Sequence, residues 1–306
     1  MQNKTFKRYK TYLPIMVMML PGMIYLLINN YLPMAGLVIA FKSIDYSKGV
    51  FGGDWNGFTN FKFLFRTTDA YIITRNTLLY NATFIVLGTI LSFGVALLLN
   101  EVKNRFMSRF YQTVILLPFL ISMVIVSYLV FGFLGEGQGY VNNTLLPMLG
   151  LDPISWYMEP KYWPYILVLV NLWKTIGFNC IIYLAAIIGI DQEYYEAATL
   201  DGASKWQQIR TITLPLIAPI IVIMTLLAVG KIFYSDFGLF YQVPLNSGIL
   251  YDTTNVIDTY VFRGLLQSNN IGMSAAAGFY QSLVGFSLVI LTNYTVRKFS
   301  KDNALF

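Results

Sequence analysis

The sequence predicts an all-α polytopic membrane protein with about six transmembrane helices. Its mean hydropathy is +0.58, and only 12% of its 306 residues are charged. Soluble domains carry roughly 25% charged residues, so this chain holds about half of the usual share. Several apolar stretches also reach the ~20 residues that a helix needs to cross ~30 Å of hydrocarbon. We therefore expect residues 1–306 to form one transmembrane domain.

Six apolar stretches are candidates for these spans. The first follows a basic start and continues well beyond the core of a signal peptide, so we expect an uncleaved span that bends near Pro33. Prolines within later spans, such as Pro118, are tolerable because neighbouring helices can satisfy the freed backbone groups. The predicted spans cover residues 13–41, 76–100, 110–134, 163–190, 214–238 and 275–297.

The distribution of lysine and arginine predicts the orientation. With the N-terminus inside, the inner segments carry twelve of these residues and the outer segments carry seven. The positive-inside rule then places both termini in the cytoplasm. The polar segment 191–213 also falls on the cytoplasmic side, and it is the one long polar stretch between two apolar spans that still looks folded.

The sequence lacks the residues and motifs that several classes of catalytic and metal site require. The chain has no histidine and a single cysteine, Cys180, so HExxH zinc sites, histidine-based triads and intrachain disulfides are excluded. No GxxxxGK[ST] phosphate loop is present, and we expect no ATP hydrolysis by this chain. The net charge of +6 fits the flanks of membrane spans, so we predict no nucleic-acid partner.

The segment 191–213, which we call the elbow, is predicted to form two short helices joined by a sharp turn. Glutamate, alanine and leucine favour a helix from Gln192 to Leu200. Gly202 suits a helix end, because a positive φ angle costs glycine nothing. A second short helix is expected over residues 203–211, and Pro215 fits the first turn of the helix that follows.

The spacing of the elbow resembles the EAA loop of ABC importer permeases. The motif reads EAA, three residues, Gly, nine residues and then I-x-L-P. This resemblance implies the ABC importer permease fold and an elbow that docks into a cytoplasmic ATPase, with ATP and Mg²⁺ held by that partner and no cofactor in this chain. It assigns ATPase coupling to Glu196, Ala197, Ala198, Asp201, Gly202, Ile212, Leu214 and Pro215.

A second set of segments resembles carbohydrate permeases of the LplB type, which are relatives of the maltose and alginate importer permeases. These segments are 172–174, 230–238, 256–260 and 293–294, and the resemblance covers nearly the whole chain. It implies a complex in the bacterial cytoplasmic (inner) membrane with a second related permease and an ATPase dimer. An extracellular or periplasmic sugar-binding protein would deliver an oligosaccharide or polysaccharide fragment.

Aromatic and polar residues within the spans are candidates for the substrate pathway. Sugars present flat apolar faces and hydrogen-bonding groups, and aromatic residues make up 16% of the chain. Tyr234 is expected one turn from Lys231 on the same helix face. The alternative for the aromatic residues is a belt at the membrane interface. The predicted pathway residues are Trp173, Lys174, Asn179, Lys231 and Tyr234.

The two lysines within spans have a second interpretation. A buried charge is usually paired, so Lys174, which lies deep in its span, could serve a structural role. Lys231 lies nearer the outer end, where its amine could reach water. The sharper hypothesis is that both lysines line the pathway and favour anionic sugars such as uronate oligomers.

Three other functions remain open at the level of the sequence. An EAA-loop permease could carry amino acids or peptides, and the ligand of its binding protein would separate this case from a sugar importer. A membrane-bound enzyme would need acid, base or nucleophile groups that the spans barely offer. A sensory subunit would share the ATPase contact yet accumulate no solute.

Overall fold

The computed structural model describes residues 2–45, 47–49, 51–268 and 270–299. Within these residues all regular secondary structure is helical, apart from one isolated antiparallel β-bridge between Lys42 and Trp55. In the part of the chain that the structure describes, five helices are long and apolar enough to cross a membrane, or six if one bent pair counts as a single span. The predicted all-α polytopic fold is confirmed. Lys301, which entered the orientation count, lies outside the described residues.

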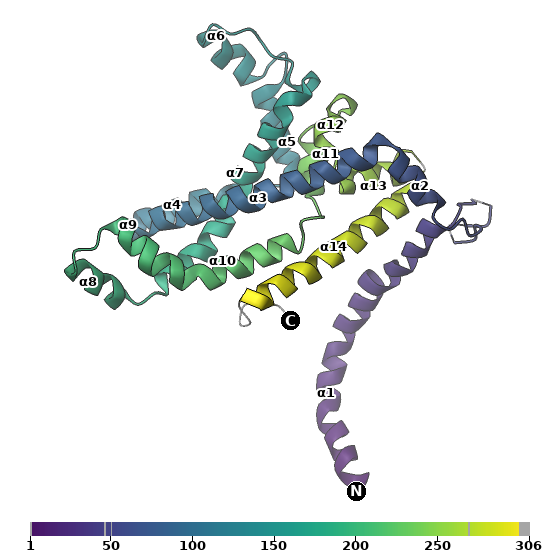
Figure 1. The fold of residues 1–306 in the computed structure, drawn as a ribbon, viewed down its shortest axis with the longest axis horizontal. Coiled ribbons are helices and arrows are strands. Elements are labelled where there is room, and N and C mark those ends of the chain that lie inside the picture. The colour runs from purple at the N-terminus through teal and green to yellow at the C-terminus, as the bar shows by residue number, and fades with distance from the viewer. Residues whose placement is uncertain (1, 46, 50, 269, 300–306) are drawn as a thin grey trace.

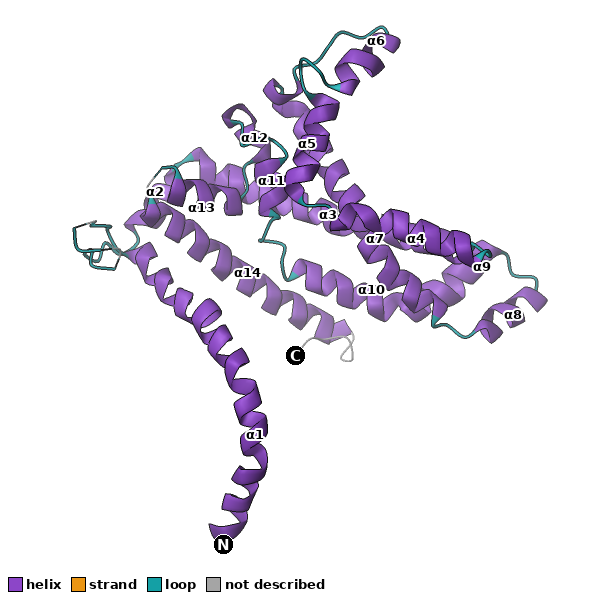
Figure 2. Ribbon diagram, turned by 180° about the vertical axis from the view of Figure 1, so that it is seen from behind, coloured by secondary structure: helices purple, strands orange, loops and turns teal. Residues whose placement is uncertain are grey.

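Two long helices form the centre of the bundle. Helix α3 (Thr68–Asn100) packs along α7 (Trp163–Ile188), as Figures 1 and 2 show. The small residues Gly88, Ser92 and Ala96, four apart in the sequence, are all buried on α3. Such a stripe lets transmembrane helices approach closely. Helices α10 (Leu214–Val229) and α14 (Ile271–Phe299) complete the bundle beside this pair.

The predicted span 110–134 is broken into two helices. Helix α4 (Arg105–Leu120) is followed at once by α5 (Met123–Leu134), and their axes differ in direction by 96°. Pro118 lies in the last turn of α4, and the Ser122 side chain caps α5 by accepting a hydrogen bond from the Ile125 amide. The chain therefore stops one helix and starts another within two residues, and α5 leaves the bundle as an arm that carries the 135–158 segment (Figure 1).

The remaining helices lie at the ends of the bundle and on its arms. The first predicted span forms an apolar helical stretch, Tyr12–Phe41, and no part of its most apolar window is buried. Residues 12–31 stand clear of the other helices (Figure 1). The residues from Leu32 to Phe41 instead pack on α14, with Ile39 and Ala40 buried and the ring centroids of Phe41 and Phe279 5.2 Å apart. The stretch changes from α-helix to a π-helical turn and then to 3₁₀ geometry around the expected bend at Pro33. The elements not yet named are α1 (Gln2–Leu26), η1 (Leu27–Tyr31), η2 (Leu32–Phe41), α2 (Thr59–Arg66), η3 (Val141–Leu145), α6 (Leu146–Met148), η4 (Trp156–Met158), η5 (Pro160–Tyr162), α8 (Gln192–Leu200), α9 (Lys205–Gln208), η6 (Ile209–Thr213), α11 (Phe237–Gln242), η7 (Gly248–Leu250), α12 (Tyr251–Thr254) and α13 (Ile257–Leu266).

The bundle has two distinct ends. The end with α8 and α9 is called the elbow end, and the end with α2, α11, α12 and α13 is called the far end (Figures 1 and 2). The far end has its own apolar core around Trp163, Phe240 and Leu250. Arg263 is buried there and donates to the side chains of Asn246, at 3.0 Å, and Asn255. Burial lowers the pKa of Arg263, and the nearby Tyr251 and Tyr241 oppose that shift.

One predicted span ends earlier than expected. Helix α10 stops at Val229 and α11 begins only at Phe237, so the predicted span 214–238 is interrupted by a non-helical segment. Tyr234 and Lys231 are therefore not on one helix face, and that prediction is wrong. The segment carries Gly230, Lys231, Ser235 and Asp236 beside its apolar residues, and this polar content is the sequence signal of the break that the prediction passed over.

Candidate functional site

The elbow begins and ends with local caps that the sequence encodes. Helix α8 covers Gln192–Leu200, the range predicted, and the Asp191 side chain caps it by accepting a hydrogen bond from the Glu193 amide at 3.1 Å. Ser204 then caps α9 in a reciprocal capping box with Gln207. The second helix is shorter than expected, because the residues from Ile209 to Thr213 form a π-helical turn that leads directly into α10.

The turn at Gly202 explains the spacing between the EAA triplet and the glycine. Gly202 has φ +81°, the left-handed conformation that was predicted. The Ala203 amide donates to the Ala198 carbonyl at 2.9 Å, and the Gly202 amide donates to the Thr199 carbonyl at 3.0 Å. This pair of bonds is a Schellman cap. Ala198, the last residue of the triplet, thus accepts the bond that closes the cap, so the triplet and the glycine belong to one local structure.

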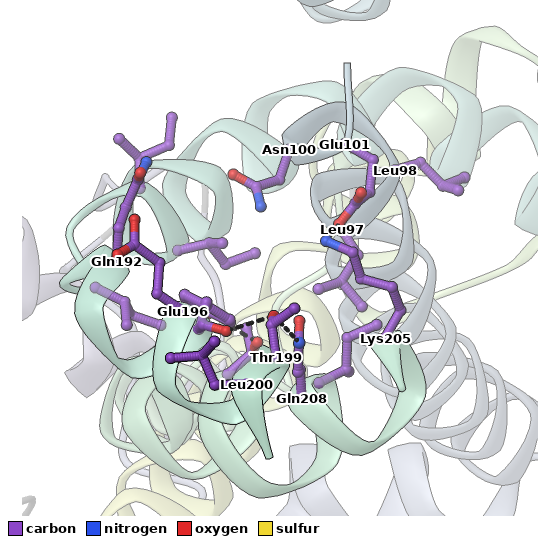
Figure 3. A pocket seen from close by; sticks show the side chains of 16 residues that line it. Leu97, Leu98, Asn100, Glu101, Gln192, Glu196, Thr199, Leu200, Lys205 and Gln208 are labelled. Atoms are coloured by element: carbon purple, nitrogen blue, oxygen red, sulfur yellow. Dashed lines mark hydrogen bonds and ion pairs between the residues drawn. The ribbon is translucent and has the colours of Figure 1, made fainter. Parts of the chain in front are cut away.

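Side-chain hydrogen bonds brace the two arms of the elbow against each other. The hydroxyl groups of Tyr195 and Thr213 lie 2.9 Å apart, and the Gln208 amide donates to the Thr199 hydroxyl at 2.9 Å (Figure 3). Lys205 also forms an ion pair with Glu101, the residue directly after α3, at 3.1 Å, but both side chains are more than half exposed, so the pair adds little stability. The braces make α8, α9 and the start of α10 one unit.

The outer surface of the elbow is open. No residue of α8 is buried, and Glu196, Ala197, Asp201, Gly202 and Pro215 are all exposed, whereas Ala198 and Ile212 are half-buried. Leu214 is 40% exposed. Two large apolar side chains that sequence reasoning did not single out, Leu200 and Trp206, are 89% and 70% exposed. An apolar patch of this kind at a polar helix pair is typical of a protein contact.

Between the elbow and the ends of α3 and α7 lies a cavity of about 660 Å³. Leu97 and Leu98 of α3 and Ile187 of α7 supply its apolar wall, and Glu101 and Glu196 contribute carboxylates (Figure 3). The elbow therefore does not pack flat against the spans. It is joined to them by the continuous chain at both ends, through residues 189–191 from α7 and through Ile209–Thr213 into α10, and the bond between Tyr195 and Thr213 links it to the start of α10.

A second, polar cavity lies between α3, α7 and the end of α10, and it is open to the surface of this chain, since Lys231 and Tyr234 in its lining are exposed. Its volume is about 240 Å³, and it contains three of the five predicted pathway residues, Asn179, Lys231 and Tyr234. Asn171, Thr175 and Asn179 recur every four residues, so one face of α7 turns polar groups toward it. Asn81 and Thr89 of α3 line the same cavity and were not predicted. The four-residue spacing on α7 is the sequence signal that marks this face.

Trp173 and Lys174 do not line this polar cavity. Trp173 is 44% exposed and borders two apolar hollows of about 390 and 300 Å³ on either side of the α4–α5 bend. The Lys174 amine donates to the carbonyl oxygens of Pro118 at 3.2 Å, Phe119 at 3.1 Å and Ile121. The Pro118 and Phe119 carbonyls lie in the last turn of α4, and Ile121 directly follows it, so a cation is favourable there. The Pro118 carbonyl also accepts a hydrogen bond from the Ile121 amide at 3.3 Å. The geometry supports the structural interpretation of Lys174.

Close packing holds Lys174 against α4. A Cβ atom added to Gly177 would lie 2.0 Å from the Ile115 carbonyl oxygen, so only glycine fits at this point of contact between α7 and α4. The rings of Phe119 and Phe178 also stack, with centroids 4.6 Å apart. The bend, the glycine contact and the lysine thus form one structure on the side of α7 that faces away from the polar cavity.

The two arrangements together define a class of protein: a membrane permease with a polar cavity among its spans and a braced, exposed elbow at one end. The chain belongs to the family described as binding-protein-dependent transport system inner membrane component, which matches residues 84–301. It is therefore a multi-pass transport permease of the inner (cytoplasmic) membrane and not an enzyme.

Two proteins of Bacillus subtilis match almost the whole chain. The polygalacturonan/rhamnogalacturonan transport system permease protein YteP is 34% identical over 286 residues, which are 94% of this chain and 88% of that protein. Protein LplB is 33% identical over 287 residues, which are 94% of this chain and 89% of that protein. The predicted resemblance to LplB-type permeases is confirmed.

Solved structures give the same result for the fold. A chain of a bacterial ABC transporter involved in the import of the acidic polysaccharide alginate matches with a TM-score of 0.88 and 34% identity, covering 97% of this chain and 100% of that chain. A structure of a bacterial alginate ABC transporter in complex with an alginate pentasaccharide-bound periplasmic protein matches with a TM-score of 0.87 and 34% identity, covering 97% and 98%. The predicted ABC importer permease fold is confirmed.

Proposed function

We propose that this chain is a permease subunit of an ATP-driven importer for oligosaccharides or polysaccharide fragments, with a preference for acidic sugars. The observation that carries the proposal is the polar cavity between α3, α7 and α10, in which amide and hydroxyl groups surround the single cation Lys231. Amides, hydroxyls and an aromatic ring suit a sugar, and a lysine suits a carboxylate. The substrates named for the relatives above, polygalacturonan, rhamnogalacturonan and alginate, support the same substrate class.

The elbow supplies the coupling in this proposal. Its open surface, with Leu200 on α8 and Trp206 on α9, docks into a cytoplasmic ATPase, and closure of the ATPase dimer moves α10 through the braced unit. The elbow end then faces the cytoplasm, together with both termini. ATP and Mg²⁺ are bound by the ATPase, and a second related permease completes the membrane pathway. A sugar-binding protein delivers the substrate at the far end, as a periplasmic protein accompanies the alginate transporter.

Replacing Lys231 by methionine tests the substrate assignment. Uptake of trigalacturonate by cells that carry the complete transporter is expected to fall about tenfold, because a hydrogen bond to a charged group contributes about 1.5–3 kcal/mol. Lys231→Arg keeps the charge and should retain most of the uptake. Lys161→Met, at an exposed lysine paired with Glu159, serves as the matched control and should have no effect.

Two results of this experiment would limit the proposal. Unchanged trigalacturonate uptake in Lys231→Met would remove Lys231 from the pathway. Normal uptake of a neutral sugar such as galactotriose, with no uptake of trigalacturonate by the unmodified transporter, would remove the preference for acidic sugars alone. An amino acid or peptide bound to the partner binding protein would replace the sugar assignment altogether.

The isolated subunit is expected not to bind ATP. No phosphate-binding loop of the GxxxxGK[ST] type occurs in the sequence, so no row of backbone amides is arranged to hold the phosphates. Equilibrium binding of a fluorescent ATP analogue to the purified subunit, free of ATPase, would measure this. Saturable binding that Mg²⁺ strengthens would contradict the expectation.

A further inference from the structure

The interruption between α10 and α11, residues 230–236, is held in place by side chains from other helices. We call this segment the break. The Asn81 amide of α3 donates to the carbonyl oxygens of Ile232 at 2.8 Å and Tyr234 at 3.2 Å. Asn81 also lines the polar cavity, so its amide ties the break to the cavity wall. The break also makes backbone turn bonds of its own, such as that from the Tyr234 amide to the Lys231 carbonyl at 2.8 Å, so it is an ordered structure.

Two further side chains complete this arrangement from the opposite side. The Gln281 amide of α14 donates to the Phe233 carbonyl at 2.7 Å and to both carboxylate oxygens of Asp258 at 3.1 Å. Asp258 of α13 in turn accepts from the Ser235 amide at 2.8 Å. Gln281 is only 6% exposed. Burial raises the pKa of Asp258, and the hydrogen bonds from Ser235 and Gln281 oppose that rise.

These hydrogen bonds satisfy polar backbone groups of the break, and they also fix residues that line the polar cavity. Non-helical backbone within a membrane protein persists only where protein or a wet cavity satisfies its polar groups, and transporters use such unwound segments at their substrate sites. The break carries both Lys231 and Tyr234, the two cavity residues that do not lie on a helix. Their positions therefore depend on the three side chains that hold the break.

We propose that Asn81, Asp258 and Gln281 are positioning residues that fix the break so that Lys231 and Tyr234 face the polar cavity. The inference deepens the proposed function and rests on it for the identity of the substrate. It predicts that removal of a donor to the break displaces Lys231 and Tyr234 even when the rest of the fold is kept. A purely structural role would instead loosen the whole bundle.

Cysteine labelling can separate these two outcomes. Cys180 is the only cysteine in the sequence, so Cys180→Ala gives a background in which Tyr234→Cys or Lys231→Cys is the single reactive thiol. The labelling rate with a charged methanethiosulfonate reagent reports the position of that thiol in the assembled transporter in nanodiscs. Met148→Cys, at a residue of the α5–α6 arm that is 80% exposed, provides a reference rate.

The test variants are Asn81→Leu and Gln281→Met, which remove the donors and nearly keep the side-chain volume. The matched control is Asn142→Leu, because Asn142 is also a buried asparagine, 3% exposed, whose amide donates to the Ile154 carbonyl at 2.9 Å far from the break. The test variants are expected to change the rate at Tyr234→Cys by about tenfold, the factor for one lost buried hydrogen bond. The control should leave that rate within about twofold.

The outcomes decide the inference and the proposed function separately. Unchanged labelling in Asn81→Leu and Gln281→Met, or an equal change in Asn142→Leu at the same loss of melting temperature, overturns the inference. Asp258→Asn adds an independent check, since its amide would face the donors of Ser235 and Gln281 and should shift the rate as well. Protection of Lys231→Cys by trigalacturonate tests the cavity assignment, and its absence would leave the role of the three positioning residues standing.

Discussion

Replacing Gly202 by valine is expected to abolish substrate-stimulated ATP hydrolysis while membrane insertion stays intact. Gly202 has φ +81°, and a residue with a Cβ atom pays roughly 1–2 kcal/mol there, with a β-branched residue paying more. An added Cβ would meet no atom within 4 Å, so the whole effect comes from the backbone conformation. The Schellman cap would then open, and α8 would no longer hold its angle to α9. ATPase assays on the reconstituted transporter, with and without loaded binding protein, measure the result.

Two variants serve as controls for this prediction. Gly202→Asn should retain most of the stimulation, because asparagine tolerates the left-handed region better than other residues. Gly150→Val introduces the same strain at φ +71° in the arm beyond α6, also without a contact within 4 Å, and should leave stimulation unchanged. Normal coupling in Gly202→Val would remove the turn from the mechanism.

Replacing Lys174 by methionine is expected to destabilise the subunit by about 3 kcal/mol, because three carbonyl groups at the end of α4 would lose a charged donor. Thermal unfolding of the purified subunit in detergent measures this loss. Lys231→Met is the matched comparison and should leave the melting temperature nearly unchanged, since no hydrogen bond to a carbonyl holds that amine in the described structure.

The two interpretations of Lys174 give opposite results. If Lys174 supports the α4–α5 bend, Lys174→Met lowers stability and assembly, and transport falls as a consequence. If Lys174 lines the pathway, the same variant leaves stability and basal ATPase intact and lowers uptake alone. A Lys174→Met subunit that melts and assembles normally would therefore contradict the structural role proposed here.

The elements that sequence reasoning located are those with local causes. Apolar runs identify spans because the transfer of each apolar side chain into lipid is favourable independently of the rest of the fold. The boundaries of α8 were predicted because its helix formers and its terminal glycine are neighbours in the sequence. Gly202 could be assigned its turn for the same reason.

The elements that were missed have distant causes. The bend after α4 passes within a continuous apolar stretch, and it is held by Lys174, more than fifty residues further along the chain. The break after Val229 mixes polar and apolar residues, and its conformation is held by Asn81, Asp258 and Gln281 from three other helices. Hydropathy measures the transfer of side chains into lipid and carries no information about where a helix bends or breaks.

The pathway residues divide in the same way. Residue type alone selected Trp173 and Asn179, but these lie six residues apart on α7 and point to different surroundings. Helical phase separates them, and the polar repeat at 171, 175 and 179 identifies the face that lines the cavity. The contribution of Asn81 required knowledge of which face of α3 meets α7, which the sequence does not state.

The first part of the first helical stretch, residues 12–31, stands clear of the bundle and has no buried residue. Its side chains there fit into no pocket of this chain, so their shapes are not constrained by neighbours within the subunit. Leucine, isoleucine, methionine and valine should be interchangeable at these positions as far as the fold of this chain is concerned. On α3 the same exchanges would disturb packing against α7. Amino-acid substitutions should therefore accumulate quickly in this part of the first span, as long as its overall hydrophobicity is preserved. They should accumulate slowly along the face of α3 that meets α7.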